Sequence, residues 1–431
     1  MTLNAQPACP AFLDRADALR LLSQEPELFV VYDRNVDWVA EELLGGLPIR
    51  AKIALEASEE AKTPETALAV CRQLLGCDAT RRALLVAVGG GFITDVTGFA
   101  AAIYKRGIRY ANVPTTLLGQ VDAAIGGKTG VNLDGYKNML GAFHMPEFTL
   151  LAPEFLKTLP ARQWRCGLAE LLKTFLIADA DAYNSLLSTL PCAKTLENEH
   201  GSANIAASCT KTPENEHEPA KIATPCTKMA ENEHEPAKIA APCAKTAENE
   251  HALAKIVTPC AKTADNEHGL AKIAAPCAKT AENEHAPAEW VRQAARIKAA
   301  IVARDPYEEG ERAVLNLGHS FGHAIEYLAL QKGADILHGE AVAMGIVLAA
   351  LVSEGLGEAP KGLARRLAED FASVGLPTQS PYPVEELLEA LQKDKKAAGN
   401  QIKFVLLRAP GNVFLHSMTP QEAYDCYLRS R

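Results

Sequence analysis

Short apolar runs alternate with helical patterns over the first 150 residues of the chain. Glu27–Asp33 and Arg81–Gly91 are apolar runs that end in polar or glycine-rich turns, as strands buried on both faces of a parallel sheet do. A helical pattern over Asp95–Gly107 then leads into a further strand pattern over Ile108–Thr116. This alternation predicts an α/β fold with a doubly wound parallel sheet.

From Pro153 onward the apolar positions follow the period of amphipathic helices. The predicted helices cover Arg165–Ile177, Glu289–Ala303, Asn316–Leu330 and His338–Leu356. We therefore expect a first domain over residues 1–151 and a mainly helical second domain over 152–431. The functional site is expected in the cleft between the two domains.

Near-identical 17-residue units interrupt the second half, and we assign residues 192–288 to this insertion. Each unit holds one Cys and, eight residues later, one His, which does not match the short ligand spacing of zinc units. Prolines before most of these cysteines break any continuous helix. We expect a solvent-exposed insertion without a catalytic role, and a self-association scaffold or a metal array are the alternatives.

Composition excludes several classes of protein. With 431 residues, 48% hydrophobic positions and a net charge of −9, the chain is neither disordered nor suited to nucleic acid. No apolar stretch approaches the roughly 20 residues of a membrane span. The N-terminus lacks a signal-peptide pattern, and the 11 cysteines form no recognisable disulfide framework. A reducing, cytoplasmic location is expected.

Two glycine-rich segments carry candidate ligand chemistry. Gly89–Gly91 closes a strand and opens a helix, where backbone N–H groups can approach a phosphate, although a tight turn would look the same. Asp95 could then hold a cofactor or cap that helix. Polar side chains that suit an anionic, hydroxylated ligand follow in an expected loop over Pro114–Asn138. They are Thr115, Thr116, Asp122, Lys128, Asn132, Lys137 and Asn138.

The helical half supplies residues of the metal-binding type. Glu170 and Lys173 share one helix face, His319 and His323 share another, and His338 opens a further helix. A carboxylate with two or three imidazoles suits a divalent cation such as zinc, and spacing alone predicts both His319 and His323 as ligands. Nearby polar residues, several of them cationic, imply an anionic substrate. They are Lys298, Glu308, Arg312 and Asn316.

Five stretches together resemble the 3-dehydroquinate synthase family of sugar phosphate cyclases in order and spacing. They are GGGFITDVTGFAAAIYKRG, VPTTLLGQVDAAIGGKTGVN with YKNMLGAF, GLAELLK, LNLGHSFGHAIE and LHGEAVAMG. The resemblance implies a Rossmann-like NAD-binding domain and a C-terminal, mainly helical domain that holds Zn²⁺ or Co²⁺. It also implies conversion of 3-deoxy-D-arabino-heptulosonate 7-phosphate (DAHP) to 3-dehydroquinate and phosphate. The implied route is transient oxidation by NAD⁺, β-elimination, re-reduction, ring opening and an intramolecular aldol reaction.

Residue roles are carried over by matching motif. The implied metal ligands are Glu170, His319 and His338, so His323 would face the substrate phosphate instead. The implied catalytic and substrate-binding residues are Asp122, Lys128, Lys137, Asn138, Lys173, Lys298, Glu308, Arg312, Asn316 and His323, with Lys395 or Lys396 at the phosphate. The implied NAD contacts are Asp33, Glu59, Lys62, Gly90, Gly91, Asp95, Thr115, Thr116, Lys128, Lys137, Phe155, Thr158 and Leu159. Arg106 resembles a residue that reaches the partner's phosphate, which implies a homodimer.

Three other functions compete with this interpretation. A related cyclase would act on sedoheptulose 7-phosphate or glucose 6-phosphate, which lack the carboxylate that Arg312, Lys298 and Asn316 suit. A metal-dependent polyol dehydrogenase would release NADH and would need fewer cations. A non-catalytic scaffold would use the repeats and would need neither metal nor NAD.

Overall fold

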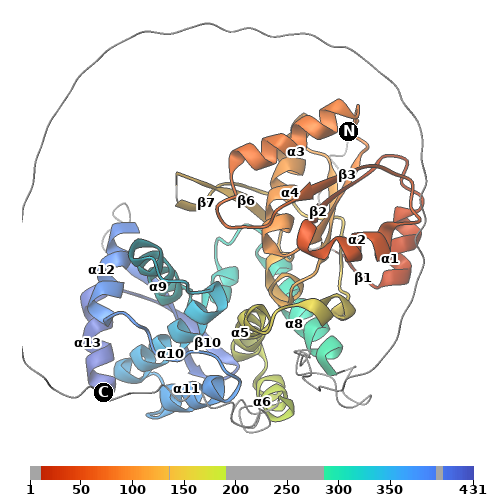
Figure 1. Cartoon of the computed structure of the whole chain (residues 1–431). Coiled ribbons are helices and arrows are strands. Elements are labelled where there is room, and N and C mark those ends of the chain that lie inside the picture. Colours follow the sequence, from red (N-terminus) through yellow and green to blue (C-terminus); the bar gives the residue numbers. More distant parts are fainter. Residues whose placement is uncertain (1–10, 135, 191–285, 395–400) are drawn as a thin grey trace, which may run out of the picture. The chain divides into compact units, whose positions relative to one another are not determined.

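A computed structural model describes residues 11–134, 136–190, 286–394 and 401–431 of the chain (Figure 1). These residues belong to one structural unit. Residues 192–285 of the repeat insertion and the two candidate phosphate ligands Lys395 and Lys396 lie outside the described residues, so the expectations about them stay predictions. The last three residues assigned to the insertion, 286–288, begin a helix instead.

A six-stranded parallel sheet forms the N-terminal half, in the order β1-β8-β5-β4-β2-β3. The strands are β1 (Ala11–Leu13), β2 (Leu28–Asp33), β3 (Ile49–Leu55), β4 (Leu84–Gly89), β5 (Arg109–Pro114) and β8 (Phe148–Leu150). The helices between them are α1 (Arg15–Leu22), α2 (Asp37–Leu44), α3 (Pro64–Gly76) and α4 (Gly91–Ile103). The predicted α/β fold with a doubly wound parallel sheet is confirmed.

The alternation of side chains along the central strands explains why both faces of the sheet are covered. Phe29 and Val31 of β2 pack with α3 and α4 in one apolar cluster, whereas Leu28 and Val30 pack with α1 and α2 in another. Figure 1 shows these two helix pairs on opposite sides of the sheet. A strand buried on both faces reads as a continuous apolar run, which is the pattern that the sequence contains.

The glycine-rich segment after β5 is more ordered than the expected loop. It forms a π-helical turn over Gly119–Ala123 and then an antiparallel hairpin of β6 (Lys128–Leu133) and β7 (Tyr136–Phe143). Gly130 and Gly141 face each other in this hairpin, and a Cβ on either one would lie within 2.7 Å of a backbone oxygen of the opposite strand. The glycines therefore permit close strand pairing. From composition alone, the same glycine-rich segment is interpreted as a loop.

The C-terminal half is mainly helical, as predicted. Its helices are α5 (Ala161–Ala178), α6 (Ala180–Thr189), α8 (Ala286–Arg304), α9 (His319–Lys332), α10 (His338–Leu356), α11 (Leu363–Ser373), α12 (Val384–Asp394) and α13 (Pro420–Ser430). One antiparallel hairpin, β9 (Ile402–Ala409) with β10 (Asn412–Met418), was not expected. The helix α10 contacts α5, α9, α11 and α13, so it forms the centre of this half.

One described helix, α10, is long and apolar enough to cross a membrane, contrary to the expectation that no stretch comes close. However, 72% of its apolar window is buried inside the fold. Its apolar character is therefore explained by its place at the centre of the helical half.

Candidate metal and nucleotide site

Three candidate metal ligands come from three different helices. Glu170 lies in the middle of α5, while His319 and His338 are the first residues of α9 and α10. One ligand atom from each lies within 4.8 Å of the others. The structure therefore brings together the three residues that the family resemblance implies as metal ligands.

Two glycines of α10 allow this approach. A Cβ on Gly339 would lie 2.1 Å from the backbone oxygen of Cys166 in α5, and a Cβ on Gly345 would lie 2.1 Å from that of Gly318. Both distances are too short for any larger residue. Because Gly339 follows His338 and Gly318 precedes His319, these contacts set the two imidazoles beside α5.

The buried carboxylate of Glu170 fits a divalent cation. Both of its oxygens are buried. Lys173 Nζ pairs with Oε2, whereas Oε1 receives no hydrogen bond, an arrangement that costs free energy unless a second positive group completes it. His338 Nε2 and His319 Nε2 lie 3.4 and 3.8 Å from Glu170 Oε1, so both rings face the carboxylate. One carboxylate and two imidazoles form the donor set of a catalytic zinc site with an open position.

Their surroundings give the two imidazoles different pKa values. Burial and the positive charge of Lys173 lower the pKa of His319 to about 3, so its ring is neutral and offers a lone pair. Burial would also lower the pKa of His338, but Glu170 and Glu326 outweigh it and raise this pKa to about 10. A cation that binds here must therefore displace a proton from His338.

A buried row of alternating charges runs from the metal group to the π-helical turn. Lys173 Nζ pairs with Glu170 Oε2 and lies 3.7 Å from Asp122 Oδ1. Lys298 Nζ, from α8, donates to the same Asp122 oxygen at 2.5 Å and to the Asp122 backbone oxygen at 2.9 Å. Burial would raise the pKa of Asp122, but Lys298 and Lys173 outweigh it, so the carboxyl stays ionised. Two carboxylates and two ammonium groups thus balance each other.

A second group of polar side chains links the hairpin to the segment before α9. Glu308 pairs with Lys128 of β6 and accepts a hydrogen bond from Asn316 Nδ2 at 2.6 Å. The guanidinium of Arg312 donates to the backbone oxygens of Pro306 at 2.5 Å and Gly126 at 3.0 Å. These contacts hold two cations where the sequence predicts an anionic substrate.

Several predicted NAD residues, among them Asp33, Gly90 and Thr115, lie at the carboxyl ends of the parallel strands, where dinucleotides bind in such sheets. Gly90 caps α4 without a side-chain bond, and a Cβ there would meet Thr116 at 3.0 Å. Lys62 Nζ donates to Asp95 Oδ2 at 2.6 Å and to Asn138 Oδ1 at 2.7 Å. Lys62 therefore connects a predicted cofactor residue with a predicted substrate residue.

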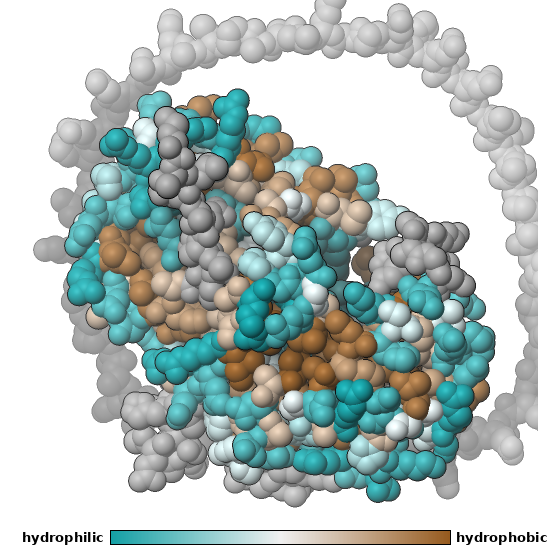
Figure 2. Space-filling view, turned by 180° about the vertical axis from the view of Figure 1, so that it is seen from behind, coloured by the Kyte–Doolittle hydropathy of each residue, from teal (hydrophilic) through white to brown (hydrophobic). Residues whose placement is uncertain are grey.

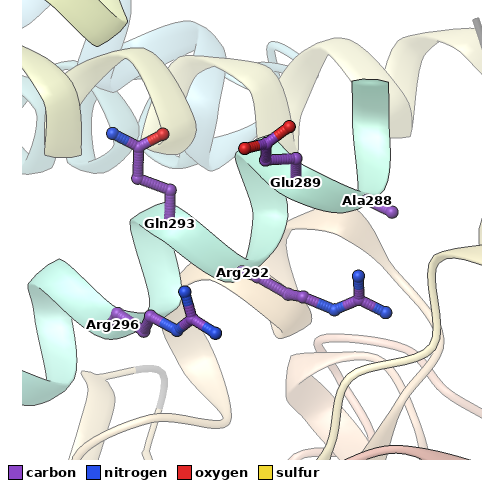
Figure 3. A pocket seen from close by; sticks show the side chains of 5 residues that line it. All are labelled: Ala288, Glu289, Arg292, Gln293 and Arg296. Atoms are coloured by element: carbon purple, nitrogen blue, oxygen red, sulfur yellow. The ribbon is translucent and has the colours of Figure 1, made fainter. Parts of the chain in front are cut away.

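Two hollows differ in their relation to this site. One of about 290 Å³ is lined by Arg34, Leu55, Glu56, Ala61 and Thr66, and Arg34 and Ala61 adjoin the predicted NAD residues Asp33 and Lys62 in sequence. A larger one of about 640 Å³ runs along α8. Its lining is Ala288, Glu289, Arg292, Gln293 and Arg296, and Figure 3 shows Arg292 and Arg296 on one side of the helix. It contains no predicted site residue, so volume alone does not locate the chemistry.

Some predicted residues lie apart from these groups. Arg106 is exposed in the turn after α4, and Phe155 packs edge-on against Trp38 in the apolar core. His319 and His323 do not share a ligand group: His323 groups instead with Glu326 and His338. The expectation from spacing, that both are ligands of one ion, is therefore not supported by the grouping.

Sequence reasoning missed the residues that support the ligands. Glu326 contacts Lys137 and His338, and Arg162 of α5 forms a two-bond pair with Glu340 of α10 at 2.7 and 2.8 Å. Glu340 in turn accepts from the backbone N–H of Leu337, which fixes the start of α10 at His338. The signal for Glu326 was its spacing of seven residues from His319, which places both on one helix face.

The fold and the site define a class of protein. Its members join a parallel sheet of the dinucleotide-binding type to a helical domain that carries a metal-binding group. Family models agree: the 3-dehydroquinate synthase N-terminal model matches residues 52–166, and the C-terminal model matches residues 260–397. The chain is 34% identical over 379 residues to 3-dehydroquinate synthase of Acidithiobacillus ferrooxidans, covering 88% of this chain and 80% of that protein. The chain belongs to the 3-dehydroquinate synthase family.

Other relatives and solved structures are consistent with this assignment. The 3-dehydroquinate synthase of Pyrococcus abyssi is 32% identical over 381 residues, covering 88% of this chain and 85% of that protein. The 2-epi-5-epi-valiolone synthase of Streptomyces hygroscopicus, solved with NAD⁺ and Zn²⁺, has a TM-score of 0.69 at 24% identity and covers 98% and 96% of the two chains. A 2-deoxy-scyllo-inosose synthase, solved with carbaglucose-6-phosphate, NAD⁺ and Co²⁺, has a TM-score of 0.66 at 21% identity, covering 97% and 96%. At these identities the structural likeness shows the fold alone.

Proposed function

We propose that the chain is a 3-dehydroquinate synthase that converts DAHP to 3-dehydroquinate and phosphate, with NAD⁺ and a divalent metal as cofactors. The observation that carries the proposal is the group of buried Glu170, buried His319 and partly buried His338 beside the charge row of Lys173, Asp122 and Lys298. Relatives of that name at over 30% identity support it. Residues 1–151 would then bind NAD⁺, and residues 152–431 would hold the metal.

Each cofactor has a place in this arrangement. At Glu170, His319 and His338 a zinc or cobalt ion would polarise a substrate hydroxyl and favour its ionisation. At the carboxyl ends of β2–β4, NAD⁺ would accept a hydride and return it within the same turnover.

The chain's own side chains would bind and orient the substrate. Lys128 and Arg312 present cations for carboxylate and phosphate, and Asn138 and Lys137 approach from the hairpin. His323, exposed on α9 and with its ring 5.4 Å from that of His319, would carry protons near the phosphate. Asp122, kept ionised by two lysines, would hold Lys173 and Lys298 in place. This positioning favours the single conformer in which elimination and ring closure occur.

Phosphate release from DAHP tests the proposal. Purified, metal-loaded protein with catalytic NAD⁺ is expected to release phosphate without net accumulation of NADH, and omission of NAD⁺ or metal should stop the release. Net NADH would indicate a dehydrogenase instead. Release from sedoheptulose 7-phosphate but not from DAHP would replace the proposed substrate, and no NAD⁺ binding at all would favour a scaffold.

Lys128 is expected to make substrate binding depend on pH. Partial burial, with repulsion from Arg312 and Lys298, lowers the pKa of Lys128 to about 8. The ammonium is therefore charged below pH 8 and loses its charge as the pH rises through that value. We expect the KM for DAHP to rise above pH 8 in the unaltered protein.

The variant Lys128→Arg separates this effect from others. Arginine stays protonated at all accessible pH values, so its KM, even if higher at neutral pH, should no longer rise near pH 8. An identical rise in both proteins would show that another group titrates.

We further propose a homodimer in which Arg106 reaches the partner's site. Lys105 and Arg106 both have left-handed backbone angles, with φ of 48° and 66°, a conformation that is strained for residues with side chains. Lys105 Nζ and Arg81 hold this turn through hydrogen bonds, which leaves Arg106 exposed. Large apolar side chains are exposed on the hairpin at Tyr136 and Met139, and the face seen in Figure 2 also carries hydrophobic areas.

Mixing two inactive variants tests the role of Arg106. Arg106→Ala and Glu170→Ala subunits are combined so that dimers exchange. If Arg106 acts across a two-fold interface, half of the dimers are mixed and each has one complete site, so about a quarter of the activity should return. If Arg106 acts within its own subunit, mixing restores nothing.

The proposed location is the reducing cytoplasm. Cys71, Cys77, Cys166 and Cys426, the cysteines that the structure describes, are all free thiols. Burial raises the pKa of Cys166 to about 11, so this thiol is neutral and unreactive. Both observations suit a compartment without disulfide formation.

A further inference from the structure

Glu326 lies between the metal group and the hairpin, and the functions derived so far give it no role. It is on α9, seven residues after His319, so both residues occupy the same face of the helix. Its carboxylate side chain is only 8% exposed. A charge that is buried to this extent needs specific partners.

Both oxygens of Glu326 have such partners. Oε1 accepts a hydrogen bond from Lys137 Nζ of β7 at 3.0 Å, and Oε2 lies 3.2 Å from His338 Nδ1. The other ring nitrogen of His338 faces Glu170. Glu326 thus engages the nitrogen of His338 that would not bind the metal, and it holds the proposed substrate lysine with its second oxygen.

The two imidazoles of the metal group differ in this respect. His319 Nδ1 lies 3.1 Å from the backbone oxygen of Leu317, a neutral acceptor. His338 has a carboxylate in the same position. A carboxylate fixes the tautomer and the ring orientation of a ligating histidine and makes the ring a stronger donor to the metal.

We propose that Glu326 is a positioning residue that sets the His338 ring for metal binding and ties Lys137, with the β6–β7 hairpin, to the metal site. This inference rests on the proposed function only for the role of Lys137, because the effect on the metal requires no substrate. The hairpin lysine and the metal ligand share one carboxylate, so loss of Glu326 affects both.

The competing interpretation is that Glu326 itself binds a cation with His323 and His338, since atoms of these three residues also lie within 4.8 Å of one another. The contacts favour the positioning role. Lys137 and His338 already occupy the two oxygens of Glu326, and a positive ammonium 3.0 Å away disfavours a second cation. The number of metal ions per chain distinguishes the two interpretations.

The test measures zinc affinity of the metal-free full chain by competition with a chelator, without NAD⁺ or DAHP. Glu326→Gln keeps the shape of the side chain but loses its charge and one of its two acceptors. We expect it to weaken zinc binding about 10- to 100-fold, as loss of such a partner typically does. Cobalt-loaded Glu326→Gln should also show a changed visible absorption spectrum, because the ring of His338 is no longer fixed.

Two controls accompany this measurement. Glu25→Gln removes a half-buried carboxylate that pairs with Arg109 far from the metal group, and it should leave zinc affinity and the cobalt spectrum unchanged. Lys137→Met should raise the KM for DAHP with little change in zinc affinity, whereas Glu326→Gln changes both. If Glu326→Gln is poorly folded, Glu326→Asp, which keeps the charge but cannot reach both partners, replaces it and should bind zinc with intermediate affinity.

Two results would overturn the proposal. Unchanged zinc affinity and an unchanged cobalt spectrum in folded Glu326→Gln would remove its basis. Two zinc ions per unaltered chain, with one lost in Glu326→Gln, would make Glu326 a ligand instead. A chain whose zinc affinity depends on Glu326 but which releases no phosphate from DAHP would contradict the proposed function and leave the effect on the metal intact.

Discussion

Replacement of Glu170 by Gln is expected to abolish metal binding and to reduce phosphate release from DAHP by about three orders of magnitude or more. A metal ion contributes several kcal/mol of charge stabilisation, and each 1.4 kcal/mol or so corresponds to a factor of ten in rate. Glutamine preserves the volume of a residue whose side chain is fully buried on α5. The loss therefore reports the missing negative charge opposite His319 and His338, and not a cavity.

Two measurements on one preparation check this expectation: metal content after dialysis and the rate of phosphate release. Glu41→Gln, which alters an exposed carboxylate on α2, should keep the metal and full activity. Glu170→Gln that keeps its metal and its rate would place the metal site elsewhere. Glu170→Gln that keeps its metal but loses its rate would make Glu170 catalytic without being an essential ligand.

Replacement of Lys173 by Met is expected to cause the largest loss of stability, about 3–5 kcal/mol in the metal-free protein. Lys173 is 1% exposed and lies between Glu170 and Asp122. Burial opposes its charged form, but the two carboxylates outweigh burial and raise its pKa. Without Lys173, Glu170 keeps only the charged imidazole of His338, and Asp122 keeps only Lys298.

Zinc should restore part of this loss, because a cation at Glu170 replaces the missing positive charge. Urea unfolding with a chelator and with zinc measures both effects, and zinc should raise the stability of Lys173→Met more than that of the unaltered protein. The control Lys52→Met breaks an exposed pair with Glu41 and should cost no more than about 1 kcal/mol. If Lys173→Met and the unaltered protein were equally stable in chelator, Lys173 would not be needed to stabilise the buried carboxylates Glu170 and Asp122.

The parallel sheet could be predicted because its strands are buried on both faces. The run at Glu27–Asp33 is β2 from Leu28, and the run at Arg81–Gly91 contains β4. The predicted helix over His338–Leu356 coincides with α10, whose first residue is a candidate ligand. In these segments local pattern and tertiary environment require the same residues.

The two hairpins could not be recognised in the same way. The strands β6 and β7 contain Gly130 and Gly141 and several polar residues, which favour a loop when only composition is considered. Their pairing depends on the fit of opposite strands, which is a tertiary property. The strand β9 does contain an apolar run, Phe404–Leu407, but a run this short fits a buried helix as well as a strand.

The candidate site likewise contains residues that the sequence could identify and residues that it could not. Spacing placed His319 and His323 on one helix face but could not tell which of them meets Glu170, because that depends on how α9 packs against α5 and α10. Family motifs supplied the distinction, and in the structure Glu170 groups with His319 and His338. Glu326 was missed because its partners Lys137 and His338 are distant in sequence, so only the folded chain brings them together.

The packing of α5 against α8 has a consequence for synthesis of the chain. Phe175 of α5 lies edge-on to Trp290 of α8 with ring centres 5.8 Å apart, yet the repeat insertion separates the two helices in sequence. At about 5–20 residues per second, the roughly 100 intervening residues take a ribosome about 5–20 s to produce. The strands of the sheet can pair in that interval. The apolar side of α5 stays exposed to chaperones until α8 has been synthesised. Each additional 17-residue unit would lengthen this wait by about 1–3 s.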